Sequence, residues 1–173
     1  MRWIWIDRIL ELTKGERCVA LKSVSAGEDV LHDQFPVVGR PGEAGYVRPR
    51  PALPNPLVLE GMAQTSGVLV GHARDFRERV ILAKVGKARF TAVAEPGFVL
   101  RHTATLDRID DIGATARIRT DRLEPRTGEP TRLAEAELMF SHVTPERTGL
   151  DMPDHNFVFT DQLMDLLRRS GFA

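Results

Sequence analysis

The chain has 173 residues, of which 42% are hydrophobic and 28% charged, and its 24 basic side chains balance 24 acidic ones. This is the composition of a globular domain rather than of a disordered segment. A general nucleic-acid binder would usually carry a basic excess, so zero net charge argues against one. No apolar run reaches the roughly 18 residues of a membrane span. The only cysteine, Cys18, cannot form a disulfide within the chain, which fits the cytoplasm.

The N-terminal third of the chain gives mixed signals. Residues 4–12 fit both a helix and the start of a strand. A turn signal at 14–16 is followed by alternation over 17–25, which predicts a strand. Cys18 lies in that alternation and is expected to be a small core residue rather than a nucleophile.

Residues 36–56 carry six prolines and three glycines, a composition that predicts a long irregular loop. A loop of this length inside a compact domain is more often functional than idle. The nearly all-apolar run from Leu57 to His72 then predicts a buried helix. Asn55 is expected as its N-cap, with Pro56 at the first helical position.

Two polar residues in this helix, Glu60 and Gln64, lie four positions apart and therefore share a face. Apolar surroundings penalise a charged carboxylate unless it is paired or used. Glu60 is therefore a candidate general acid or base, although a purely structural, hydrogen-bonded carboxylate is the alternative. The N–H groups at the helix start could bind a carbonyl oxygen as negative charge develops on it, or form an ordinary cap.

Strand-like alternation follows the helix in five stretches: 80–85, 87–90, 99–109, 114–123 and 133–143. Turn signals lie at Pro96-Gly97 and at Gly128. One buried helix with successive antiparallel-looking strands predicts an α+β fold. Residues 145–173 are expected to form a C-terminal extension, in which Thr160 could cap a short helix over 161–169.

The segment Pro51–Gln64, which reads Pro-Ala-Leu-Pro-Asn-Pro-Leu-Val-Leu-Glu-Gly-Met-Ala-Gln, resembles a family motif. It is similar to the central-helix motif of the 3-hydroxyacyl-acyl-carrier-protein dehydratases of type II fatty-acid synthesis, the FabZ- and FabA-like proteins. Residues 6–11 look like that family's opening helix, 86–90 with 95–97 like its next strand and turn, and 134–139 like its final strand. The resemblance spans roughly residues 3–143.

The resemblance implies a hotdog fold over residues 1–144, in which an antiparallel sheet wraps a long central helix. It also implies a homodimer or a higher assembly, such as a dimer of dimers or a hexamer, and neither a metal nor an organic cofactor. The expected substrate is a thioester of acyl-carrier protein or of CoA. The resemblance also implies that acyl chains enter a tunnel at the subunit interface. Carrier proteins are acidic, so basic residues are expected near this tunnel; the candidates are Arg74, Arg77, Arg79, Lys84, Lys87 and Arg89.

In the family, a His before a Phe-Pro pair removes the α-proton, the helix Glu of the other subunit protonates the leaving hydroxyl, and a Gly N–H at the helix start binds the thioester oxygen. Glu60 matches the helix Glu. Gln34 stands where the His is expected, before Phe35-Pro36, and Asn55 stands in the Gly position. Glutamine cannot take a proton at neutral pH. His32, two residues earlier, is the candidate replacement base.

The candidate catalytic residues are therefore Glu60, Gln34 and His32. The candidate substrate-binding residues are Asn55, Gln64, Phe35, Pro54 and Arg89. His72 lies roughly 18 Å along the helix from Glu60, too far to act with it in one subunit. His102 and His142 are expected to be satisfied core or sheet residues.

Three functions stay open from the sequence alone. The first is a dehydratase-like lyase with an altered base. The second is a hotdog thioesterase in which Glu60 and Gln34 act on the thioester. The third is a non-catalytic subunit that binds acyl groups or acyl-carrier protein.

Overall fold

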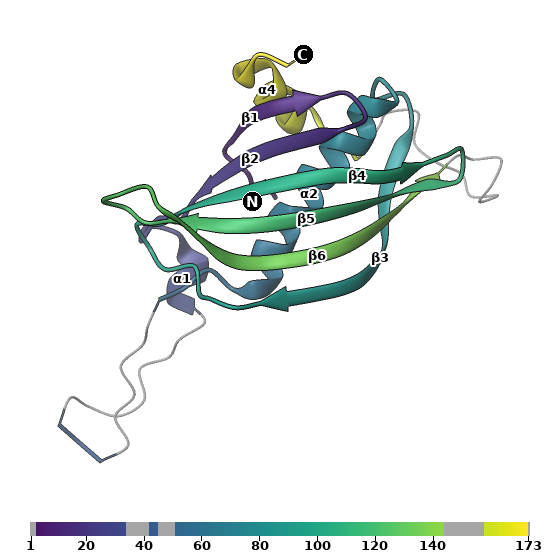
Figure 1. Cartoon of the computed structure of the whole chain (residues 1–173). Helices are drawn as coiled ribbons and strands as arrows, with labels where there is room; N and C mark the ends of the chain where they lie inside the picture. The colour runs from purple at the N-terminus through teal and green to yellow at the C-terminus, as the bar shows by residue number, and fades with distance from the viewer. Residues whose placement is uncertain (1–2, 34–41, 45–50, 144–157, 173) are drawn as a thin grey trace.

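The computed structural model describes residues 3–33, 42–44, 51–143 and 158–172. Within these residues, one antiparallel sheet of six strands curves around a long helix (Figure 1). The strands are β1 (Arg8–Thr13), β2 (Arg17–Ser23), β3 (Arg79–Phe90), β4 (Val99–Ile109), β5 (Gly113–Leu123) and β6 (Pro130–Val143). They lie in the order β1-β2-β4-β5-β6-β3, so β1 and β3 are the two edges of the sheet.

The strands follow the alternation of the sequence closely, and β4 has the predicted bounds. Neighbouring strands bury the same face: Ala104 of β4 pairs with Ile118 of β5, and both side chains are buried. The two stretches predicted over 80–85 and 87–90 form one strand, β3. Its pairing with β6 shifts at Ala83 and at Gly86, which explains why the alternation breaks there.

The central helix α2 spans Asn55–Ala73 and buries side chains such as Val58 and Met62 against the sheet. The prediction that Asn55 caps this helix is wrong, since Pro54 is the N-cap and no side chain supplies a capping bond. The Pro54 carbonyl already accepts the N–H groups of Leu57 and Val58, so the helix begins one residue earlier than expected.

The expected opening helix over residues 6–11 is also wrong, because this segment leads into β1. Ile6 and Ile9 are both buried, which gave the sequence its helical spacing. Ile6 precedes the strand, however, and the β1–β2 pairing shifts between Ile9 and Glu11. An irregular entry and a bulge therefore produced a spacing that resembles a helix.

Two shorter helices complete the described structure, α1 (Asp29–Asp33) and α4 (Asp161–Ser170). Thr160 occupies the predicted N-cap position of α4, but its side chain makes no capping hydrogen bond. Gly171 ends this helix in the left-handed conformation. Helix α4 lies beside β1 (Figure 1). The hydroxyl of Ser170 accepts the backbone N–H of Ile9 at 3.1 Å, so the C-terminal helix covers part of this sheet edge.

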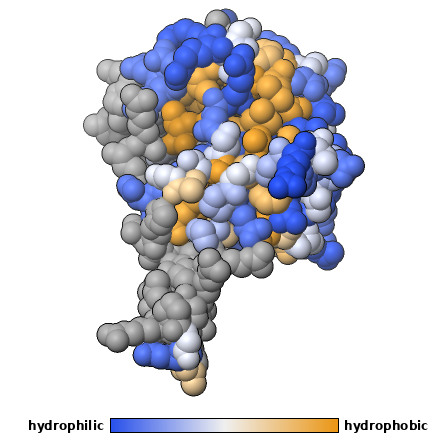
Figure 2. Space-filling model, turned by 90° about the vertical axis from the view of Figure 1, so that its left-hand side faces the viewer, coloured by the Kyte–Doolittle hydropathy of each residue, from blue (hydrophilic) through white to orange (hydrophobic). Residues whose placement is uncertain are grey.

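Cys18 is fully buried, as predicted, and this burial raises the pKa of its thiol to about 12. A thiol of this kind is a core residue and not a nucleophile. None of the described helices combines the length and the hydropathy of a membrane-spanning segment. Figure 2 shows one face on which apolar side chains gather between hydrophilic ones.

Candidate active site

Glu60 and Gln64 lie on successive turns of α2 and are joined by a hydrogen bond. The Gln64 Nε2 donates to Glu60 Oε1 at 2.9 Å. The same amide also binds the N-terminal segment, because Nε2 donates to the Trp3 carbonyl at 3.0 Å and Oε1 accepts the Trp5 N–H at 2.8 Å. Gln64 therefore orients the carboxylate of Glu60 and ties residues 3–5 across the helix.

The Glu60 side chain is half-buried and lines a pocket of about 380 Å³. Most of the other lining residues are apolar, and they come from five parts of the chain. Those parts are residues 3–4, helix α2, strands β3 and β6, and residues 158–163. We call this cavity the Glu60 pocket. A carboxylate in a mostly apolar pocket suits a substrate that combines a polar reacting group with a hydrocarbon chain.

The start of α2 borders a second pocket, of about 650 Å³, which Pro54 lines. Lys22 also lines it and is buried beside Glu28, with 2.5 Å between Lys22 Nζ and Glu28 Oε1. Asn55, the first residue of α2, is exposed and does not belong to the described lining of either pocket.

His102 lies on β4, faces α2 and is fully buried. Its Nδ1 is 2.8 Å from Thr120 Oγ1, while Nε2 has no hydrogen-bond partner among the described residues. Burial, and then the positive charge of Lys22, lower the pKa of His102 to about 3. His102 is thus a buried sheet residue, as expected, although only one of its two ring nitrogens has a hydrogen-bond partner among the described residues. It stays neutral near pH 7.

Two further histidines whose side chains are described, His142 and His72, lie in other parts of the fold. His142 is buried in β6 with Nδ1 2.7 Å from Glu78 Oε2. His72 is half-buried near the end of α2, where burial and the charge of Lys14 lower its pKa. Neither of these two side chains is in the described lining of the Glu60 pocket.

Two residues of the predicted site, Gln34 and Phe35, lie outside the described residues. The backbone of His32 belongs to α1, but its side chain is outside the described part of the chain. The relation of Gln34 and His32 to Glu60 therefore stays a prediction.

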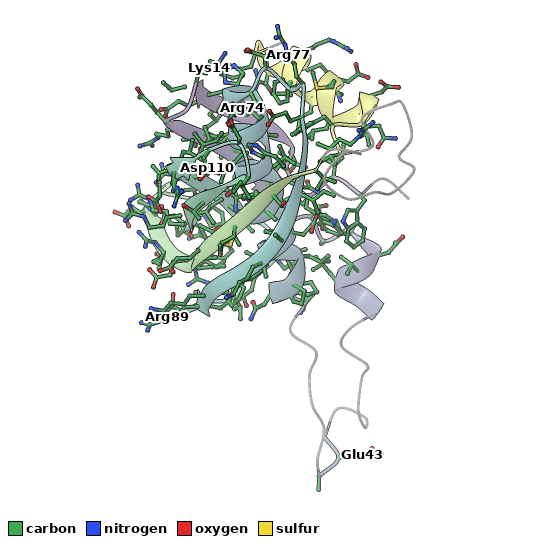
Figure 3. The ribbon with its side chains drawn as sticks, turned by 90° about the vertical axis from the view of Figure 1, so that its right-hand side faces the viewer. Lys14, Glu43, Arg74, Arg77, Arg89 and Asp110 are labelled. Atoms are coloured by element: carbon green, nitrogen blue, oxygen red, sulfur yellow. The ribbon has the colours of Figure 1, made fainter. Side chains whose placement is uncertain are left out.

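The basic residues predicted near the tunnel are spread along the molecule. Arg74 and Arg77 lie at one end of β3 and Arg89 at the other (Figure 3). Arg89 is exposed, is 4.0 Å from Glu135, and is not part of the described lining of the Glu60 pocket. Arg74 is paired with Asp111 at 3.1 Å. These arginines do not form one cluster.

No group of three or more His, Cys, Asp or Glu side chains that could hold a metal ion occurs among the described residues. The polar side chains that line the Glu60 pocket include the carboxylate of Glu60 and the amide of Gln64. Such a pair can carry a proton and hydrogen-bond a substrate oxygen.

Sequence reasoning missed the two chain ends that line this pocket. Trp3 and Ile4 border it near Glu60. Phe159 and Leu163 border it from residues 158–163, which we call the C-terminal segment. The one signal for these contacts was the pair of glycines at positions 67 and 71 on α2, four residues apart. Small residues at this spacing leave room for a partner on one helix face, but they do not say which segment fills it.

Several curated proteins with similar sequences share one name. The chain is 33% identical over 140 residues to a 3-hydroxyacyl-acyl-carrier-protein dehydratase FabZ from Desulforamulus reducens, a match that covers 80% of this chain and 86% of the relative. A relative of the same name from Pelotomaculum thermopropionicum is 32% identical over 140 residues, covering 80% and 87%. No family profile matches the chain.

Solved structures resemble this one in fold. An acyl-CoA hydrolase variant from Staphylococcus aureus, in complex with coenzyme A, has a TM-score of 0.58 and 11% identity over 95% of this chain and 90% of its own. AziG from S. sahachiroi has a TM-score of 0.56 and 14% identity, over 79% and 90%. Together with the sheet wrapped around α2, these likenesses confirm the α+β hotdog fold.

Proposed function

Because this chain belongs to the 3-hydroxyacyl-acyl-carrier-protein dehydratase (FabZ) family, we propose that it removes water from 3-hydroxyacyl thioesters, with Glu60 as the acid. The observation that carries this proposal is the Glu60 carboxylate at the side of an apolar pocket, held at Oε1 by Gln64. The thioester carrier is acyl-carrier protein or CoA.

In the proposed reaction, a base removes the proton at the carbon next to the thioester carbonyl. The electron pair of that C–H bond forms the carbon–carbon double bond, and the bond from the neighbouring carbon to the hydroxyl oxygen breaks. Glu60 gives its proton to the departing hydroxyl, so that water leaves. Oε2 of Glu60 is the oxygen that Gln64 does not occupy, and it is the proposed proton donor.

The base is proposed from the sequence. Gln34 precedes Phe35-Pro36 where the family has a histidine, and a side-chain amide has no basic nitrogen at neutral pH. We assign the base to His32, two residues earlier. Gln34 then serves as a hydrogen-bonding residue beside the substrate.

The test is one assay in which the chain meets 3-hydroxyacyl and saturated acyl thioesters side by side. We expect water loss from the first substrate and no thiol release from the second. Glu60→Gln should lower the rate of dehydration by about 10²- to 10⁴-fold, the usual contribution of a positioned acid. Glu129→Gln, a change of an exposed turn carboxylate, should leave the rate unchanged.

Two further variants test the base. His32→Ala should abolish dehydration, and Gln34→His should raise the rate because it restores the family's residue. An unchanged rate in Glu60→Gln, or no reaction with either substrate, would contradict the proposal.

The second candidate is a thioesterase, and the residue that favours it is Gln34. Thioester hydrolysis needs a base or nucleophile and a group that stabilises the oxyanion, but no second proton carrier. Glu60 and Gln34 would fill these two roles. If the native chain releases thiol from saturated acyl thioesters and Glu60→Gln does not, the protein is a thioesterase rather than a dehydratase.

A further inference from the structure

One face of α2 carries the Glu60 pocket from the carboxylate toward the C-terminal end of the helix. This face is a stripe of four residues spaced four, three and four positions apart: Glu60, Gln64, Gly67 and Gly71. From Glu60 to Gly71 this face runs roughly 16 Å along the helix axis, at about 1.5 Å per residue. Both glycines lack a side chain, so the floor of the stripe is flat beyond Gln64.

The walls of this stripe are apolar. The Phe140 ring lies over Gly67, since a Cβ placed there would be 3.8 Å from its Cε1. Val80 and Leu82 of β3 line the same pocket. A hydrocarbon chain that starts at Glu60 can therefore lie along α2 between the helix and these two strands.

The C-terminal segment closes the stripe at Gly71. A Cβ on Gly71 would lie 2.2 Å from Phe159 Cζ, so the ring occupies the place of a side chain there. Phe159 is 6% exposed and packs edge-on against Phe76, with 5.0 Å between the ring centroids. Figure 1 shows α4, which follows Phe159, at the same end of the molecule as the C-terminal end of α2.

Phe159 and the neighbouring Leu163 also line the Glu60 pocket. Leu163 is buried at the first turn of α4, so this helix anchors the segment that carries Phe159. The pocket thus has a reacting group near one end and, at the other, an aromatic ring fixed between two packed elements. Such a ring limits the length of chain that can enter.

We propose that the C-terminal segment sets the longest acyl chain that this protein accepts, with Phe159 as the stop and Leu163 as its neighbour in the wall. The inference rests on the proposed function, because it takes the Glu60 pocket as the acyl site. It assigns the specificity of that site to residues outside the Pro51–Gln64 motif.

The test measures binding, so that it does not depend on the rate of reaction. Acyl thioesters of increasing chain length compete with a fluorescent fatty-acid probe for the native chain. Each methylene that enters the pocket should add about fourfold to the affinity. Beyond a limiting length, the affinity of the native chain should stop rising or fall.

Three variants read out the position of that limit. Phe159→Ala should move it to longer chains, with at least a tenfold gain in affinity for the first lengths that the native chain rejects. Leu163→Phe should move it to shorter chains. Leu166→Ala is the matched control, because Leu166 is buried in α4 and is not in the described lining of the pocket. It should leave the limit where it is.

Each outcome separates this inference from the function on which it rests. Binding by the native chain with the same limit in Phe159→Ala and Leu163→Phe, both folded by circular dichroism, overturns the inference and leaves the function standing. Absence of acyl-thioester binding by the native chain overturns both. A limit that moves equally in Leu166→Ala would show loosening of the C-terminal segment rather than a stop at Phe159, and also overturns the inference.

Discussion

Gln64 is the residue on which the geometry of Glu60 depends. Its amide makes three hydrogen bonds, one to Glu60 and two to the backbone of residues 3 and 5. A side chain tied at three points has one orientation, and so does the carboxylate that it holds. Gln64, predicted as a substrate-binding residue, thus has the contacts of a positioning residue.

Gln64→Ala should therefore act on the reaction more than on binding. We expect kcat to fall by about tenfold or more while KM changes less, because Glu60 loses its fixed orientation and the apolar walls remain. The folded state should lose about 1–3 kcal/mol from the unpaired backbone groups. Steady-state kinetics and urea unfolding measure the two effects. Gln162→Ala, an exposed change on α4, is the control, and an equal fall in kcat there would contradict the assignment.

His102 gives the folded state a dependence on pH. Its pKa is about 3 in the folded chain, because of burial and then the charge of Lys22, against 6.5 for an ordinary histidine. Below 6.5 the unfolded chain takes up a proton that the folded chain cannot bind until about pH 3. The unfolded state therefore binds more protons in this window, and stability falls as the pH falls.

We expect the native chain to lose about 2 kcal/mol through this group between about pH 6.5 and about pH 5. His102→Gln should lose less over the same interval, because no proton is taken up at this position. Urea unfolding at both pH values gives the two differences. His72→Gln should change the pH dependence less, since His72 is only half-buried. Identical pH dependence in His102→Gln and the native chain would refute this role.

Helix α2 contains two glycines in very different surroundings. A Cβ on Gly71 would lie 2.2 Å from Phe159 Cζ, whereas a Cβ on Gly67 would meet Phe140 Cε1 at 3.8 Å, an ordinary contact. The helix alone would gain about 0.5–1 kcal/mol from alanine at either position. Packing decides between them, since overpacking costs about 1–3 kcal/mol.

Gly71→Ala should therefore destabilise the protein, while Gly67→Ala should be neutral or stabilising. Thermal and urea unfolding of the two single variants test this. In a Phe159→Ala background the cost of Gly71→Ala should disappear, which a double-mutant cycle measures as a coupling between the two positions. Equal effects of the two glycine substitutions would mean that Phe159 does not pack as described.

At the scale of the molecule, the two edges of the sheet differ. Helix α4 covers part of β1, whereas the 12 residues of β3 form an edge whose middle is exposed. Ile81, Leu82 and Val85 are between 36% and 37% exposed on this strand. A long edge with apolar side chains is a surface on which a second chain can pair, and we propose that two copies of this chain pair there.

A charge on this edge should separate the proposed dimer. We expect the native chain to have the mass of a dimer in light scattering and Val85→Lys to have the mass of a monomer with the same circular dichroism. Ile112→Lys, at an apolar side chain that is 71% exposed outside β3, should stay dimeric. A native chain that is monomeric at assay concentrations, or a Val85→Lys variant that stays dimeric, would exclude β3 as the interface.

The sequence by itself determined what depends on neighbouring residues. Strand alternation predicted the bounds of β4 and most of β2, β5 and β6, and the proximity of Glu60 and Gln64 followed from helical geometry. Local patterns led to two wrong predictions. At Ile6 and Ile9, an irregular entry to the strand and a bulge imitated helical spacing. At Asn55, the helix had already begun, because Pro54 is its N-cap.

Only the tertiary structure decided which distant segments meet on the Glu60 face of α2. Trp3 and Trp5 bind Gln64, about 60 positions away in sequence, and Phe159 packs on Gly71 from the other end of the chain. The low pKa of His102 has the same origin, because it depends on what the fold buries around that side chain. Local sequence patterns carry no information on such contacts, since no periodicity relates residues that approach one another only after the sheet has wrapped the helix.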